Sequence, residues 1–144
     1  MGKTTTAINL STALAAVNNK VLIMDLDAQG NASTGLGVPK DEREKSTYDL
    51  LTGKASLKDV VKKTNIPSLF IAPASTDLSS IDVDLFEEQG RVLKLRDLLA
   101  KESLEFDYIL IDCPPSLNLL TINSMVASNS VSYTHLRAHE TFRY

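Results

Sequence analysis

The sequence predicts an α/β fold in which a mostly parallel sheet lies between two layers of helices. Three observations predict it. Short apolar runs near positions 21–24, 68–75 and 107–112 alternate with segments of helical periodicity. Continuous apolar runs are typical of parallel strands that are buried on both faces, and such strands are joined by crossover helices. Acidic residues follow two of the runs, which indicates a ligand site at the carboxyl ends of the strands.

The composition is that of an ordinary globular protein. The 144 residues are enough for one domain, with 43% apolar residues, 23% charged residues and a net charge of −3. This charge does not favour a generally basic, nucleic-acid-binding surface, although a local patch remains open. A single cysteine excludes an internal disulfide. We see no signal-peptide pattern and no apolar run long enough to cross a bilayer, so we expect a cytoplasmic protein.

The first half of the chain predicts a helix, a strand, a long loop and two short helices. TTTAINLSTALAAV (4–17) has helical apolar spacing, and the apolar run that follows at 21–24 predicts a buried strand. Residues 28–45 are rich in Gly, Asn and Ser and then in charge, which predicts a functional loop and a solvated turn. Ser46 and Gly53 are expected to begin and end one short helix, and SLKDVVKK (56–63) predicts the next.

The second half predicts two more strands and three helices. SLFIAPAS (68–75) and DYILIDCPP (107–115) are the predicted strands. Between them, residues 76–88 predict a helix, and residues 90–102 predict an amphipathic one whose apolar face carries Val92, Leu95, Leu98 and Leu99. SLNLLTINSMVAS (116–128) predicts the last helix, with Ser116 as its N-cap.

The stretch Gly2-Lys3-Thr4-Thr5 has the composition of a phosphate-binding loop. Glycine allows backbone N–H groups to surround phosphate oxygens, lysine reaches the outer phosphates, and a hydroxyl binds Mg²⁺. The predicted helix that follows adds its positive N-terminal end. Four residues are a weak signal by themselves, and a glycine turn that caps a helix is the structural alternative.

Aspartates at the strand ends strengthen the phosphate-site interpretation. Asp112 ends an apolar strand, which is the position from which P-loop NTPases hold Mg²⁺. Asp27 can orient an attacking water or reach Mg²⁺ through a water. Both residues also fit plain turn or cap positions. Asp25 has two interpretations, a solvated strand end or an indirect partner of Mg²⁺. Cys113 is expected to be a small buried residue, because no second cysteine or nearby histidine activates it.

Three segments together resemble the ParA/Soj chromosome- and plasmid-partitioning ATPases of the deviant Walker A group, which also contains MinD. They are GKTTTAINLSTALA, VLIMDLDAQGNASTGLG and DYILIDCPPSLNLLTINSMVASNSV. The resemblance runs from Gly2 to about Val131 and covers about the first half of a typical member. It implies a P-loop NTPase fold with three α/β/α layers, ATP and Mg²⁺ as cofactors, and ATP hydrolysis by the intact parent protein.

The resemblance also implies roles for the phosphate-loop residues. Gly2, Lys3, Thr4 and Thr5 would bind the nucleotide, with Lys3 on the β- and γ-phosphates and Thr5 on the α-phosphate. Thr4 would ligate Mg²⁺, and Asp112, the Walker B carboxylate, would hold it through water.

Two switch segments are implied as well. Asp27, in the first switch, would position the hydrolytic water, so Lys3 and Asp27 are the implied catalytic residues. Ala28 stands where the family usually has proline, which affects loop stiffness more than chemistry. The remaining switch residues are Gly30 and Asn31 in the first segment and Pro114, Pro115 and Ser116 in the second.

The two ends of the sequence depart from the family pattern. The family's loop reads KGGVGKTT after a strand, and Met1 stands where its valine would be. We therefore expect residues 1–131 to be a partial P-loop ATPase domain without the first strand, two loop glycines, the signature lysine and the C-terminal half. Residues 132–144 are expected to be a non-native tail, because a buried strand does not accommodate their polar sequence. A metal site formed by His135 and His139 is the alternative.

The function implied by the resemblance is an ATP-dependent switch in chromosome or plasmid segregation. Such a protein forms an ATP-dependent homodimer, binds DNA non-specifically and is stimulated by a ParB-like partner, and it is cytoplasmic and nucleoid-associated with no membrane attachment expected. One alternative is a MinD-like ATPase of the cell-division site, which needs a membrane-binding amphipathic helix. Another is an inactive truncated fragment that binds no nucleotide and exposes unpaired strand edges. A nitrogenase-type iron protein would need paired cysteines, which Cys113 does not supply.

Overall fold

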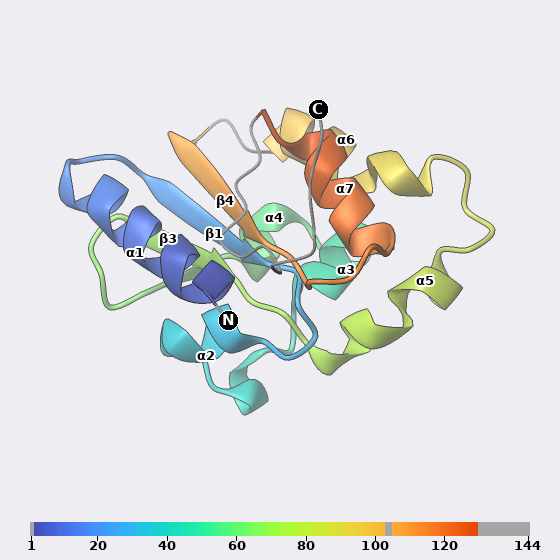
Figure 1. Ribbon diagram of the computed structural model, residues 1–144, viewed down its shortest axis with the longest axis horizontal. Coiled ribbons are helices and arrows are strands. Elements are labelled where there is room, and N and C mark those ends of the chain that lie inside the picture. The colour runs from blue at the N-terminus through green and yellow to red at the C-terminus, as the bar shows by residue number, and fades with distance from the viewer. Residues whose placement is uncertain (1, 103–104, 130–144) are drawn as a thin grey trace, which may run out of the picture.

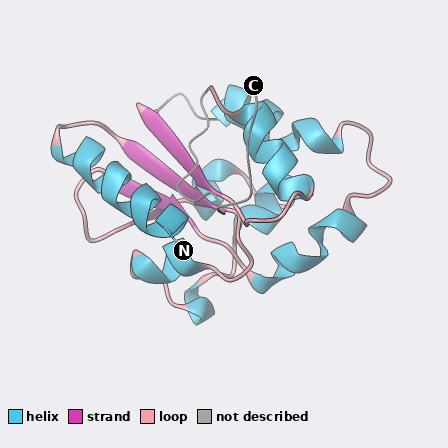
Figure 2. Ribbon diagram, in the orientation of Figure 1, coloured by secondary structure: helices cyan, strands magenta, loops and turns pink. Residues whose placement is uncertain are grey.

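The computed structural model describes residues 2–102 and 105–129, which form a sheet with helices on both faces (Figures 1 and 2). The strands are β1 (Val21–Asp25), β2 (Lys62–Lys63), β3 (Leu69–Ala72) and β4 (Tyr108–Asp112). The helices are α1 (Gly2–Ala16), α2 (Asn31–Gly35), α3 (Thr47–Leu51), α4 (Leu57–Val60), α5 (Ile81–Asp84), α6 (Lys94–Glu102) and α7 (Leu119–Ala127). Short 3-10 helices lie at Lys40–Glu42, Thr76–Ser80 and Arg91–Leu93.

The sheet is mostly parallel, as the sequence predicts. Its strand order is β2-β3-β1-β4, with β1 parallel to both β3 and β4 and only the short β2 antiparallel. The register pairs Asp25 with Asp112, so the carboxyl ends of β1 and β4 lie side by side. The predicted strand-end carboxylates are therefore brought to one edge of the sheet.

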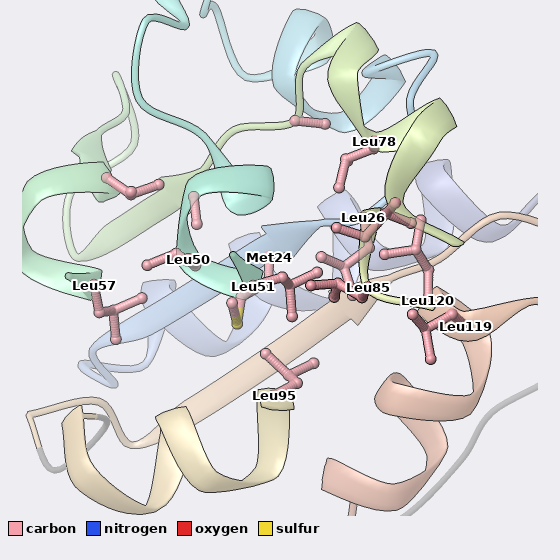
Figure 3. Close-up of a cluster of buried hydrophobic side chains, with 14 of the residues drawn as sticks. Met24, Leu26, Leu50, Leu51, Leu57, Leu78, Leu85, Leu95, Leu119 and Leu120 are labelled. Atoms are coloured by element: carbon pink, nitrogen blue, oxygen red, sulfur yellow. The ribbon is translucent and has the colours of Figure 1, made fainter. Parts of the chain in front are cut away.

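Side chains of β1 alternate between two apolar cores, which establishes the three layers. Val21 and Ile23 pack in the core formed with α1 and α2, while Leu22 and Met24 pack in the larger core formed with the helices of the opposite face. All four side chains are completely buried. Figure 3 shows the larger core, in which Met24 lies among leucines. Because both faces are covered, β1 has the continuous apolar sequence of a buried parallel strand.

Two helix starts show how local sequence sets the boundaries. Ser46 caps α3 as predicted, in a capping box in which the Asp49 carboxylate accepts from the Ser46 amide at 2.8 Å. The predicted cap of α7 is wrong: the helix begins at Leu119, and the side chain of Asn118 accepts from the Thr121 amide at 3.1 Å. Asparagine caps helices as well as serine does. The Ser116 hydroxyl instead accepts a hydrogen bond from the Asn118 side chain.

Several predicted segments differ from the structure. The helix predicted at 90–102 begins as a 3-10 helix at Arg91–Leu93, and α6 covers only Lys94–Glu102. The predicted loop at 28–45 contains α2 and a 3-10 helix. The helix predicted at 76–88 is a 3-10 turn followed by the four residues of α5. The helix predicted at 56–63 ends at Val60, since Val61 is extended and leads into β2. Short elements such as these are decided by tertiary contacts rather than by local periodicity.

β4 is the last strand of the sheet within residues 2–102 and 105–129, and its outer edge has no strand partner there. An open groove runs along this edge, lined by residues of α1, α6, β4 and α7. No helix in the described part of the chain has the length and apolarity needed to cross a membrane. The tail predicted at 132–144, with His135 and His139, lies outside the described residues.

Candidate functional site

The N-terminal end of α1 lies against the carboxyl end of β4. Lys3 Nζ donates a hydrogen bond to the Cys113 carbonyl oxygen at 2.7 Å, and Thr4 Oγ1 donates to Asp112 Oδ2 at 2.7 Å. The second pair is separated by 108 positions in the sequence. The fold thus brings together a lysine, a hydroxyl and a carboxylate at the positive end of a helix dipole.

Asp112 is buried at the centre of this cluster. Only 4% of the residue is exposed, and this burial raises the pKa of its carboxyl group. The hydrogen bond from Thr4 and the charge of Lys3 act in the opposite direction and lower that pKa. The charge of Asp27, at the end of the neighbouring strand, also raises the pKa of Asp112.

Asp27 lies in the turn that leaves β1. Its side chain accepts a hydrogen bond from the Gln29 amide at 3.0 Å, and its carbonyl oxygen accepts from the Gly30 amide at 2.8 Å. Gly30 has a φ of 66°, which glycine adopts without strain, and α2 begins immediately after it. Asp27 is half-buried, so the residue remains partly accessible at the edge of the site.

Asp25 is fully buried, so its interpretation as a solvated strand end is wrong. Its Oδ2 accepts from the Ser33 amide at 2.9 Å and from the Ser33 hydroxyl at 2.6 Å, while Oδ1 accepts from the Asp27 amide at 3.1 Å. Burial raises the pKa of the Asp25 carboxyl, and the hydrogen bonds from Ser33 and Asp27 act against this shift.

Arg43 is a residue of this region that sequence reasoning missed. Its guanidinium group is buried, with the residue 7% exposed, and it donates through Nε and Nη2 to the Val38 carbonyl oxygen. Nη2 also donates to Thr34 Oγ1 at 2.9 Å. The group lies against Gly30, whose missing side chain leaves room for it. No sequence signal pointed to this role, because Arg43 stands in a charged run that is typical of solvated turns.

The other predicted site residues are more exposed. Gly2 and Thr5 are exposed at the same end of α1 as Lys3, and Asn31 is exposed at the start of α2. Cys113 is partly buried, and burial raises the pKa of its thiol, which makes it a weak nucleophile. Pro114, Pro115 and Ser116 lie in the segment between β4 and α7.

The donor set fits a magnesium nucleotide. Hydroxyl and carboxylate oxygens are hard ligands suited to Mg²⁺, and lysine beside a helix N-terminus suits phosphate. Among the described residues, no group of three or more His, Cys, Asp or Glu side chains forms a metal cage. Mg²⁺ is commonly bound by one or two carboxylates together with substrate phosphates and waters. One buried carboxylate beside a hydroxyl therefore supplies as many protein ligands as such a site needs.

Comparison with known proteins gives the family. A family model described as AAA domain matches residues 1–135. The chromosome partitioning protein ParA of Caulobacter vibrioides (strain NA1000 / CB15N) is 48% identical over 133 residues, which cover 91% of this chain and 50% of that protein. The chromosome-partitioning ATPase Soj of Treponema pallidum (strain Nichols) is 49% identical over 131 residues, which cover 91% of this chain and 51% of that protein. The chain thus spans about half the length of these relatives.

A solved structure agrees in fold. Cobyrinic acid a,c-diamide synthase from Mycobacterium smegmatis, with bound ADP and magnesium, superimposes with a TM-score of 0.85 at 35% identity. The match covers 88% of this chain and 51% of that one. Together with the matching family model and the two relatives, it shows that the chain belongs to the ParA/Soj family of P-loop ATPases.

Proposed function

We propose that the protein binds ATP with Mg²⁺ at the α1–β4 site and hydrolyses it. The observation that carries the proposal is the convergence of Lys3, Thr4 and Asp112 at the N-terminal end of α1. The similar Mycobacterium smegmatis structure, which has bound ADP and magnesium, supports the ligand class. An oxygen donor set beside a cation and a helix N-terminus supports the same ligand on chemical grounds.

Each side chain has a distinct role in this proposal. Lys3 binds the outer phosphates, with Gly2 and Thr5 beside it at the start of α1. Thr4 and Asp112 hold Mg²⁺, which neutralises charge on the phosphates when it is bound. Asp27 orients the attacking water, because it is an accessible carboxylate at the neighbouring strand end and remains partly exposed. Lys3 and Asp27 are thus the proposed catalytic residues.

We further propose that this activity serves DNA partitioning. The names of the two relatives, a chromosome partitioning protein and a chromosome-partitioning ATPase, support this role. An ATP-dependent homodimer, non-specific DNA and a ParB-like protein are the proposed partners, and the proposed location is the nucleoid in the cytoplasm. Residues 1–131 are the proposed ATPase portion, and residues 132–144 a non-native tail.

Two substitutions separate nucleotide binding from turnover. Lys3→Ala removes the cation that faces the phosphates, and we expect it to abolish binding of a fluorescent ATP analogue. Asp27→Ala leaves the phosphate contacts in place, and we expect it to bind the analogue normally but to lose turnover by about 100-fold or more, the range typical of a positioned acid–base group. Both are measured in the 144-residue chain and in a chimera in which residues 2–129 replace the matching part of the Caulobacter vibrioides relative.

Matched controls are the exposed residues Lys101 and Asp41, each changed to alanine. Both controls are expected to behave as wild type. Undiminished nucleotide affinity in Lys3→Ala would remove Lys3 from the phosphate site, and undiminished turnover in Asp27→Ala would rule out its water-orienting role. If neither wild-type preparation binds the nucleotide, the proposed function itself fails.

A further inference from the structure

We infer that Asp25 is a positioning residue, which fixes the turn that presents Asp27 to the nucleotide. The inference rests on the proposed function in one respect, the role of Asp27 in turnover. Asp25 itself is fully buried at the end of β1 and is separated from Asp27 by a single residue. Its own oxygens are occupied by protein donors, so it acts through the backbone and not on the ligand.

Both carboxylate oxygens of Asp25 are used within the loop. Oδ1 accepts from the amide of Asp27 at 3.1 Å, which fixes the backbone of that residue directly. Oδ2 accepts from both the amide and the hydroxyl of Ser33, at 2.9 and 2.6 Å. Because Ser33 lies in the first turn of α2, a single side chain clamps the two ends of the segment between β1 and α2.

The clamp, which is the set of hydrogen bonds that Asp25 accepts from Asp27 and Ser33, is hydrogen-bonded to other elements of the fold. The Ser33 hydroxyl also accepts from the amide of Ala74 at 3.0 Å, just after β3. The Thr47 hydroxyl of α3 donates to the carbonyl oxygen of Asp25 at 2.8 Å. These bonds join Asp25 and Ser33 to two further elements, so the clamp does not move independently of the sheet.

The turn is also tied to the magnesium side of the site. The amide of Leu26 donates to the carbonyl oxygen of Asp112 at 2.8 Å. Asp27 therefore follows a residue bonded to Asp112, and its own amide is bonded to Asp25. These two contacts set the separation between the proposed water-orienting carboxylate and the proposed Mg²⁺ carboxylate. In the unclamped loop the Asp27 side chain would have more freedom, and small displacements of a catalytic group are costly.

A carboxylate is needed because three donors converge on it. Asparagine has the same shape, but its NH₂ group would face an N–H or O–H donor on one side. A buried carboxylate is also expensive to desolvate, and it is tolerated where hydrogen bonds satisfy it. The described part of the chain contains no buried side-chain polar atom without a partner. Asp25→Asn and Ser33→Ala are therefore two independent ways to loosen the same clamp.

The test compares these two variants with Leu57→Ala, in the 144-residue chain and in the chimera. Leu57 is 2% exposed in α4, outside the clamp, so its truncation destabilises the core without touching the Asp27 turn. Four quantities are measured: ATP-analogue affinity, kcat, KM, and amide hydrogen exchange at residues 27–30. We expect both clamp variants to keep affinity and KM within about threefold, while kcat falls about 10- to 100-fold. Exchange at residues 27–30 should rise in them and stay at the wild-type rate in Leu57→Ala.

The outcomes are distinguishable. Equal kcat in wild type and both clamp variants overturns the inference, as does a matching fall in Leu57→Ala. If Asp25→Asn does not fold, Ser33→Ala alone decides. If wild type shows no turnover at all, the proposed function fails. The rates of amide hydrogen exchange at residues 27–30 then still decide whether Asp25 holds the turn. Unchanged exchange in Ser33→Ala would overturn that role of Asp25.

Discussion

Gly30 and Arg43 pack closely against each other in the segment between β1 and α3. A Cβ atom at Gly30 would collide with Nη1 of Arg43, and the residue has a φ of 66°. The guanidinium group has little freedom to retreat, because it is buried and donates to the Val38 carbonyl oxygen and to Thr34 Oγ1. The glycine thus serves the loop in two ways, by its backbone conformation and by the space that it leaves.

We expect Gly30→Ala to destabilise the protein more than Gly53→Ala. Gly53 has a φ of 75°, and a Cβ atom there would have no heavy atom within 4 Å, so alanine adds only backbone strain of about 1 kcal/mol. Alanine at position 30 adds the same strain and also displaces the hydrogen bonds of Arg43, for a further loss of about 1–3 kcal/mol. Urea unfolding followed by circular dichroism measures both. Equal losses in the two variants would show that the contact with Arg43 has no energetic weight.

Candidate site residues could be predicted where the prediction depends on residue type and neighbouring sequence. Residue types and the predicted strand and helix indicated that Lys3, Thr4 and Asp112 lie at one edge of the sheet, and the structure brings them together there. Their roles toward phosphate and metal stay predictions. Ser33 and Arg43 were not predictable, because each acts through partners that the fold brings together. Ser33 in a Gly- and Ser-rich segment looks like any loop serine until Asp25 and Ala74 lie beside it.

Among the contacts between elements, a hydrogen bond between side chains links α3 to α5. The Tyr48 hydroxyl donates to Asp84 Oδ2 at 2.7 Å, and the Ser80 hydroxyl donates to the same oxygen at 2.8 Å. The bond from Tyr48, followed by that from Ser80, lowers the pKa of the Asp84 carboxyl. The same bond raises the pKa of the Tyr48 phenol.

We expect the stability lost in Tyr48→Phe to depend on pH. A carboxyl group whose pKa is lowered by folding stabilises the folded state fully at pH values above its unfolded-state pKa of about 3.9. This stability is lost as the pH falls through the folded-state pKa of the group. The difference in unfolding free energy between wild type and Tyr48→Phe should therefore be constant near neutral pH and shrink at acidic pH. Urea unfolding from about pH 2.5 to 7 spans the range in which the carboxyl titrates and measures this difference. A difference that stays constant down to the lowest pH would contradict this assignment.

Element prediction succeeded where a pattern was long or strongly apolar. The helix at the N-terminus and the three strands were found from periodicity and apolar runs, and the structure has each of them in the predicted segment. The strands predicted at 68–75 and 107–115 are shorter, however, and β4 is only partly buried. The segment at 76–88 does not form one helix, because each of its two short helices buries one apolar residue, Leu78 or Ile81, and is otherwise exposed. The α7 cap was missed because Ser116 and Asn118 are both good caps, and only the tertiary path of the chain selects between them.

At the scale of the whole molecule, the strand order explains how distant segments form one site. β1 pairs with β3 on one side and with β4 on the other, so the turn after β1 lies beside the end of β4, although most of the chain separates them. α1 covers this part of the sheet and places its first turn at the same edge (Figure 1). The fold class was predictable from alternating helices and strands, but the register that pairs Asp25 with Asp112 was not, because it depends on how the whole core packs.

The most direct test of the proposed Mg²⁺–nucleotide site is the Mg²⁺ dependence of nucleotide binding in Asp112→Asn. Affinity for a fluorescent ATP analogue is titrated with and without Mg²⁺ in the 144-residue chain and in the chimera, with circular dichroism as the check of folding. We expect Mg²⁺ to tighten binding by the wild type. In the folded Asp112→Asn variant that gain should fall about 10-fold or more, the loss typical when a metal site is weakened. A variant that keeps the full Mg²⁺ response would contradict the placement of the metal between α1 and β4.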